Sequence, residues 1–74
     1  MINRVPVRSK MLRSVGYEAE KKILELEFEA GTVYRYYDVP EFTFRALMHA
    51  DSKHAFFTAS IEGRYRCEEI RPGA

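Results

Sequence analysis

The chain has 74 residues, with 12 Lys and Arg against 11 Asp and Glu, so its formal net charge at pH 7 is +1. This length suits a single domain over residues 1–74, and such a domain buries only about 60% of its unfolded surface, which disfavours a deep active site. The near-zero charge excludes a nucleic-acid coat protein that is basic over its whole surface, so any basic binding site must be local.

The first half of the chain has the pattern of a β-sheet. Residues 2–7 predict a short extended segment, and Pro6, which lacks an N–H, puts that segment on a sheet edge or outside the sheet. Residues 12–17 and 23–28 alternate apolar and polar side chains, so we expect two paired strands. Residues 32–37 are rich in β-branched and aromatic side chains and predict a third strand, joined to the second by a hairpin turn.

The register of this hairpin decides which side chains face the core. A two-residue loop would turn the Arg35 guanidinium onto the apolar face, which is costly for an unpaired charge. A three-residue loop, with Gly31 in the left-handed conformation, places Arg35 directly opposite Glu25. We therefore predict the three-residue loop, which puts Tyr34 and Tyr36 on the core side with their hydroxyls at the rim.

The second half of the chain predicts two short helices. Residues 40–50 begin with Pro-Glu, and proline suits the first helical turn while an acid suits the positive end of the helix dipole. Residues 51–60 predict the second helix, capped by Asp51 or Ser52 and ended by Gly63. The side chains expected to face the sheet are Phe44, Leu47, Met48, Phe56, Phe57 and Ile61, with Phe42 and Ala46 widening the first stripe towards a neighbour.

Residues 64–70 alternate again and predict a final strand, with Tyr65 and Cys67 on one face. The expected fold class is therefore α+β: a small antiparallel sheet, made of a hairpin or meander plus a C-terminal strand, packed against two short α-helices.

The residue types that carry catalysis or bind metals do not form a recognisable pattern. His49, Asp51, His54 and Cys67 are the local candidates for a metal site, but no paired-histidine or paired-cysteine motif accompanies them. Cys67 in an alternating strand is interpreted as a small buried side chain, and there is no glycine-rich phosphate loop. We expect a protein that is not an enzyme, with no catalytic residue, metal, cofactor or small-molecule substrate.

The composition also indicates a compartment. One cysteine cannot form an internal disulfide, and no stretch resembles a charged segment followed by the apolar core of a secretory signal. No apolar run approaches the roughly 20 residues that span a bilayer. We expect a cytoplasmic protein that does not contact membranes.

Several short motifs in this order resemble the KTSC domain family. They are Arg4-Val5-Pro6-Val7, Val15-Gly16-Tyr17, the run from Val33 to Pro40, Ser52-Lys53 and Gly63-Arg64-Tyr65. The family has a central Tyr-x-Tyr motif, which Tyr34-Arg35-Tyr36 matches, and it occurs both at the C-terminus of some lysyl-tRNA synthetases and as small separate proteins. The resemblance covers Arg4 to Ile70 and indicates the separate form; it departs from the family at His54, where a glycine is common.

Basic side chains gather in three places, and each is a candidate phosphate contact. Residues 1–17 contain four basic side chains and no acid, whereas residues 18–29 contain five Glu against two Lys. The three groups are Arg4, Arg8, Lys10 and Arg13; Arg64, Tyr65 and Arg66, expected near Lys53 and His54; and Arg35 beside Tyr37. The first group is the strongest electrostatic candidate, because no acid interrupts it.

Two functions from different classes fit this sequence. The first is a small RNA-binding or other nucleic-acid-binding module, with RNA or tRNA as partner, in which basic side chains hold phosphates and an exposed ring stacks on an unpaired base. The family's link to a tRNA-charging enzyme implies the same partner. The alternative is a protein-protein interaction module that acts through an edge strand, either residues 64–70 or the N-terminal segment, or through an aromatic surface. A plain solvated surface, balanced by the glutamates, remains a third interpretation of the basic residues.

Overall fold

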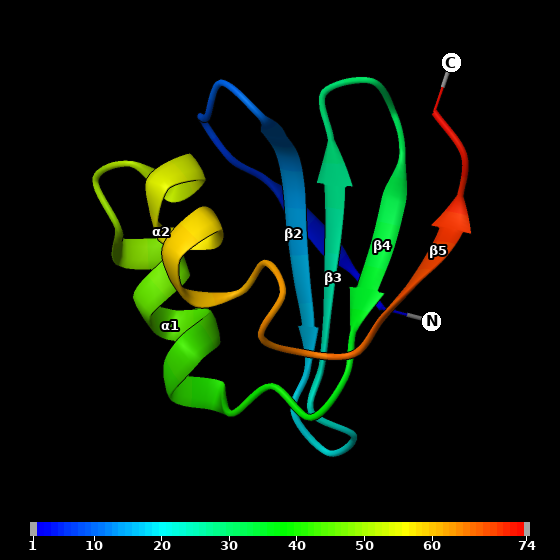
Figure 1. Ribbon diagram of the computed structural model, residues 1–74, viewed down its shortest axis with the longest axis vertical. Helices are drawn as coiled ribbons and strands as arrows, with labels where there is room; N and C mark the ends of the chain where they lie inside the picture. The colour runs from blue at the N-terminus through cyan, green and yellow to red at the C-terminus, as the bar shows by residue number, and fades with distance from the viewer. Residues whose placement is uncertain (1, 74) are drawn as a thin grey trace.

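The computed structural model describes residues 2–73, which form a five-stranded antiparallel sheet with both helices on one side of it (Figure 1). The elements in chain order are β1 (Arg4–Pro6), β2 (Leu12–Glu18), β3 (Ile23–Phe28), β4 (Val33–Tyr36), α1 (Glu41–His49), α2 (Lys53–Ser60) and β5 (Cys67–Arg71). The strands lie in the sheet in the same order, so β1 and β5 are its edges. The fold is α+β, as predicted.

The hairpin of β3 and β4 has the predicted register. The Phe28 N–H donates to the Thr32 carbonyl at 2.8 Å, which closes a three-residue loop. Gly31 in this loop has a φ of 93°, a value that residues with a Cβ rarely adopt. Glu25 therefore lies opposite Arg35 on one face of the sheet.

The hydrophobic core lies between the sheet and the two helices. Its side chains come from β2, where a register shift separates Leu12 from Val15, from alternate positions of β3, from β4 and the segment after it, and from one face of each helix. Its buried members include Leu12, Val15, Leu24, Leu26, Tyr36, Val39, Leu47, Phe57 and Ile61. Ser52 caps α2, since its hydroxyl accepts the Ala55 N–H at 3.1 Å.

Phe42 and Ala46 do not extend the buried stripe of α1 as expected. Phe42 is 75% exposed and Ala46 is exposed, whereas Thr43 and Leu47 are buried. The helix therefore rests on the sheet along the i, i+4 line of Thr43 and Leu47, and this turns Phe42 towards a hollow that it shares with Phe56 of α2.

The last strand differs from the prediction in its start and its burial. β5 begins at Cys67 instead of residue 64, and all five of its residues are exposed, Cys67 included. The reason is position: β5 is the edge strand that lies farthest from both helices in Figure 1, so the helices do not cover it. Tyr65 lies before the strand and is half-buried.

The sheet face away from the helices carries a buried carboxylate. The Glu25 side chain is only 5% exposed and lies between Arg4 and Arg35, with 2.8 Å between Glu25 Oε1 and Arg35 Nε. Ser14 on the same face donates to Glu27 at 2.8 Å. This face is therefore polar, and its charges are neutralised within the chain.

In the described part of the chain, no helix is long and apolar enough to cross a membrane.

Candidate nucleic-acid interface

Basic side chains from two distant parts of the sequence meet at one hollow. The hollow has a volume of about 350 Å³ and is lined by Arg8, Ser9 and Lys10 from the β1–β2 loop and by Asp51, Ser52, Lys53 and His54 from the start of α2. We call it the basic hollow. It joins three Lys and Arg side chains and a histidine with a single acid, so its local charge is positive.

Local hydrogen bonds hold both walls of the basic hollow. The Ser9 hydroxyl accepts the N–H groups of Met11 and Leu12 at 3.3 and 3.4 Å, which shapes the β1–β2 loop. On the other wall, the Ser52 cap fixes the start of α2, and Lys53 Nζ donates to the Ala50 carbonyl at 3.3 Å. The positive end of the α2 dipole also faces this wall, which favours anions.

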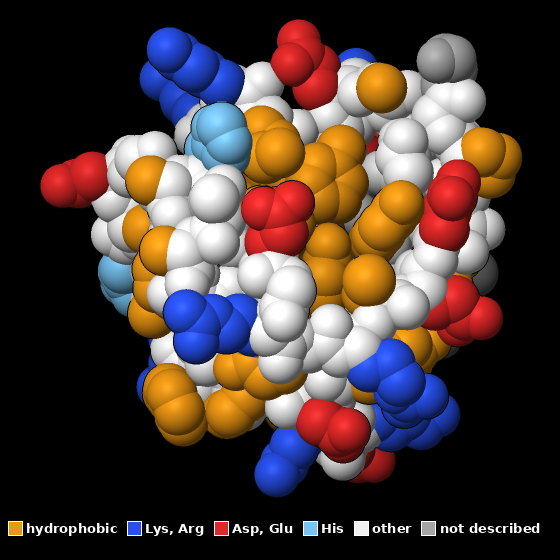
Figure 2. Space-filling model, viewed as in Figure 1, with side chains coloured by type: hydrophobic (Ala, Val, Ile, Leu, Met, Phe, Trp, Pro, Cys, Tyr) orange, Lys and Arg blue, Asp and Glu red, His pale blue; other side chains and the backbone are white. Residues whose placement is uncertain are grey.

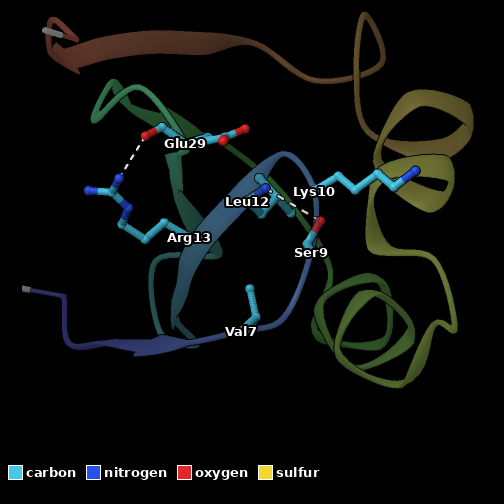
Figure 3. A pocket seen from close by; sticks show the side chains of 6 residues that line it. All are labelled: Val7, Ser9, Lys10, Leu12, Arg13 and Glu29. Carbon is cyan, nitrogen blue, oxygen red and sulfur yellow. Dashed lines mark hydrogen bonds between the residues drawn. The ribbon is translucent and has the colours of Figure 1, made fainter.

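Arg13 extends the positive surface on the other side of the loop. It lines a second hollow, of about 550 Å³, which shares Ser9 and Lys10 with the basic hollow. Figure 3 shows the Lys10 side chain pointing towards α2, whereas Arg13 points the opposite way and donates to the Glu29 carbonyl at 2.8 Å. Arg8, Lys10, Arg13 and Lys53 together form what we call the basic rim.

The side chains of the basic rim keep their charge available. The ion pairs among residues 2–73 join other side chains, and no carboxylate oxygen lies within 4.0 Å of the basic groups of the rim. Arg8, Lys10 and Arg13 are exposed, and Lys53 is half-buried. Three of the ten predicted site residues, Arg8, Lys10 and Lys53, therefore come together at one hollow without a salt bridge, and Arg13 lies on the other side of the same loop.

Arg4 and Arg35 take a different role. Both guanidiniums bind the buried Glu25 carboxylate on the far face of the sheet. The hydrogen bond to Glu25 raises the pKa of Arg35, so this guanidinium stays charged. A phosphate at this place would have to compete with a carboxylate that cannot leave, which makes these two arginines structural.

Tyr37 and Arg66 contact each other through a cation–π interaction. The Arg66 guanidinium lies 4.6 Å from the centre of the Tyr37 ring, and the Tyr37 hydroxyl donates to Glu68 at 2.7 Å. The hydrogen bond to Glu68 raises the pKa of the Tyr37 hydroxyl. These contacts attach β5 to β4, and the ring is already covered by a cation of the same chain. Tyr37 lies near Arg35, as expected, since both residues lie beside Glu68, but the two side chains are already bound to glutamates of the same chain.

Arg64 and Tyr65 do not join Lys53 and His54. They follow the end of α2, whereas Lys53 and His54 stand at its start, and they line the hollow between the helices. The Tyr65 hydroxyl lies 3.4 Å from the Thr43 hydroxyl, which accounts for its half-buried position.

Sequence reasoning missed the meeting of residues 8–10 with residues 51–54. The available signal was the pair of hydroxyls: Ser9 in a loop and Ser52 at a helix cap each precede a lysine. His54 was expected near Arg64, Tyr65 and Arg66, yet it lines the basic hollow. No group of three or more His, Cys, Asp and Glu side chains within residues 2–73 is placed to hold a metal ion.

Comparisons with known proteins place the chain in a family. Residues 8–65 match the model of the KTSC domain. A crystal structure of a KTSC domain protein from Yersinia pestis superposes with a TM-score of 0.93 at 35% identity, over 96% of this chain and 100% of that one. An uncharacterized protein of Stutzerimonas stutzeri is 49% identical over 51 residues, which are 69% of this chain and 72% of the relative. The chain belongs to the KTSC domain family.

One further relative is a longer protein. A lysine–tRNA ligase of Nostoc punctiforme is 32% identical over 60 residues, which are 81% of this chain but only 11% of the ligase. The similarity therefore concerns one small region of that enzyme.

Proposed function

We propose that this protein is a non-enzymatic module that binds single-stranded RNA through the basic rim. The observation that carries the proposal is the convergence of Arg8, Lys10 and Lys53, from two distant segments, with Arg13 continuing the basic surface across the loop and with no salt bridge from these groups to a carboxylate of residues 2–73. Lys and Arg side chains of this kind contact phosphates without reading the base sequence. The ligase relative supports RNA as the partner, since such a ligase acts on tRNA.

The test is fluorescence anisotropy of a labelled single-stranded RNA and a labelled tRNA hairpin, titrated with the protein at several salt concentrations. Four phosphate contacts on a single strand predict a slope of about −3 for log affinity against log salt. The double variant Lys10→Glu, Lys53→Glu is expected to lose roughly tenfold or more in affinity at low salt.

A matched control separates a local site from a general charge effect. Lys21→Glu with Arg64→Glu changes the net charge by the same amount, at two exposed positions outside the basic hollow. This control is expected to keep most of the affinity. Equal losses in the two double variants, or no binding of either RNA by micromolar protein at low salt, would contradict the proposal.

A second candidate function rests on β5. This strand is an edge of the sheet and is exposed along its whole length, so an extended segment of another protein can add to the sheet there. Glu68 and Glu69 favour a basic partner strand. A photo-cross-linking side chain placed at Ile70, compared with one at the exposed Ala19, tests it: capture of a defined protein from Ile70 alone is expected, and equal capture from both would contradict it.

A further inference from the structure

A further hollow, distinct from those described above and with aromatic walls, opens between the β3–β4 hairpin and α2. It has a volume of about 270 Å³ and is lined by Met11, Phe28, Thr32, Tyr34, Tyr36, Phe57 and Glu62. We call it the aromatic hollow. It contains both tyrosines of the Tyr-x-Tyr motif, and the basic rim does not use any of its side chains.

The rings of the aromatic hollow hold one another in place. Tyr36 and Phe57, only 4% and 2% exposed, form its floor, with their ring centres 5.8 Å apart in an edge-to-face contact. Phe28 and Tyr34 form a similar pair at 5.9 Å, but both remain half-buried, as does Met11. A planar ligand would therefore meet a preformed apolar surface, and binding would need little ordering of side chains.

The rim of the aromatic hollow carries acceptor oxygens. The Glu62 carboxylate is exposed, and no Lys or Arg nitrogen of residues 2–73 lies within 4.0 Å of it. Its backbone is fixed, since the Glu62 N–H donates to the Phe57 carbonyl at 2.8 Å. Thr32 adds a hydroxyl on the hairpin side. The ligand that fits is planar, apolar on its faces and has N–H donors on its edge.

The aromatic hollow adjoins the basic rim. Met11, which lines it, directly follows Lys10 of the basic hollow. Figure 2 shows the same arrangement on one face of the molecule: a broad apolar area with an acidic side chain on it lies beside blue and pale blue side chains above α2. A cationic side chain of a protein partner would also suit rings and a carboxylate, but the neighbouring Lys and Arg would repel it.

We propose that the aromatic hollow binds one unpaired RNA base that carries an exocyclic amino group, while the basic rim holds the adjoining phosphates. The base stacks on the Tyr34 ring and meets Phe28, whose ring lies at 75° to that of Tyr34, edge to face, and its amino group donates to Glu62. Uracil has no amino group, and its one edge donor, N3–H, lies between two carbonyl oxygens that the carboxylate repels, so uracil is disfavoured. This inference rests on the proposed RNA binding, whose phosphate contacts do not depend on the base.

The experiment compares labelled eight-nucleotide strands of A, C and U by anisotropy at low salt. The wild-type protein is expected to bind the A and C strands about tenfold more tightly than the U strand. Glu62→Gln, an exposed change that keeps the side-chain shape, is expected to reduce this preference to less than about threefold. Tyr34→Leu is expected to weaken A and C binding about tenfold, and Tyr34→Phe is expected to restore it.

The outcomes separate the two proposals. One outcome is binding that depends on salt, Lys10 and Lys53 but is equal for A, C and U and unchanged by Glu62→Gln. This result would overturn the base site and leave the phosphate site standing. No binding of any strand would overturn both. If Tyr34→Leu does not fold, the Glu62→Gln comparison still decides the matter, because Glu62 lies at the surface.

Discussion

Glu25 is the side chain on which the far face of the sheet depends. It is buried, and both Arg4 and Arg35 bind it. Removal of a buried charge leaves its partners uncompensated, and the cost is moderated here because both arginines still reach water. We expect Glu25→Ala to lower the free energy of unfolding by about 2 kcal/mol in urea denaturation.

Glu41→Gln is the control for this prediction. It breaks the exposed i,i+4 pair with Arg45 and is expected to cost less than about 0.5 kcal/mol. Equal costs for the two variants would show that the Glu25 pairs act as surface pairs. RNA affinity is expected to stay unchanged in both, since neither residue lies on the basic rim.

Glu27 makes the stability of the protein depend on pH, and the direction of this dependence follows from its pKa. The hydrogen bond from Ser14, followed by nearby arginines, lowers the pKa of the Glu27 carboxyl. A carboxyl with a lowered folded-state pKa contributes stability that is complete above its unfolded pKa of about 4.3 and is lost as the pH falls through the folded-state pKa.

We therefore expect Glu27→Gln to be less stable than the wild type at pH 7 and the difference to shrink as the pH falls below about 4.3. Urea denaturation at pH 7, 4.3 and 3 measures it. A difference that stays constant across these three values would show that the charge of Glu27 does not contribute.

Among the elements, α2 contributes both to the stability of the protein and to the charge of the basic hollow. Substitutions of Ser52, which caps α2 and lines the hollow, can change one of these without the other. Ser52→Ala removes the cap of the helix and is expected to cost about 1 kcal/mol in thermal unfolding, with the charge of the site unchanged. Ser52→Asp keeps a good cap and adds an anion to the hollow.

We expect Ser52→Asp to retain the wild-type stability but to bind RNA several-fold more weakly than Ser52→Ala, because added charge weakens phosphate contacts. Anisotropy and thermal unfolding of the same samples measure both quantities. Stronger RNA binding by Ser52→Asp than by Ser52→Ala would place the phosphates away from α2.

The elements that could be predicted from sequence are those whose neighbours along the chain fix them. The β3–β4 register followed from Gly31 and from the opposed Glu25 and Arg35, because the competing two-residue loop would turn Arg35 onto the apolar face. The exposure of Phe42 and of β5 could not be predicted, since each depends on which face a distant element leaves uncovered. For the site, the sequence showed that the basic residues gather at the start of the chain and the glutamates after them. It did not show which arginines bind a glutamate and which stay free, because the partner carboxylates lie far away in the sequence.

For the whole molecule, the two faces of the sheet differ in what they offer a partner. The face away from the helices has its arginines bound to buried or half-buried glutamates. The helix side carries Arg8, Lys10 and Lys53 of the basic rim and, next to them, the aromatic hollow, whereas Arg13 points away from the helices. The net charge of +1 is therefore compatible with a local positive surface. We expect the salt concentration to affect RNA affinity far more strongly than a net charge of +1 suggests.

RNA binding at the basic rim can be mapped by a two-dimensional ¹H–¹⁵N NMR titration of the labelled protein with a single-stranded RNA. We expect the largest shift changes on residues 8–13 and 51–55, smaller ones at the aromatic hollow and almost none on β5. Changes confined to residues 67–71 or to the Arg4–Glu25–Arg35 face, or no changes at millimolar RNA and low salt, would contradict this expectation.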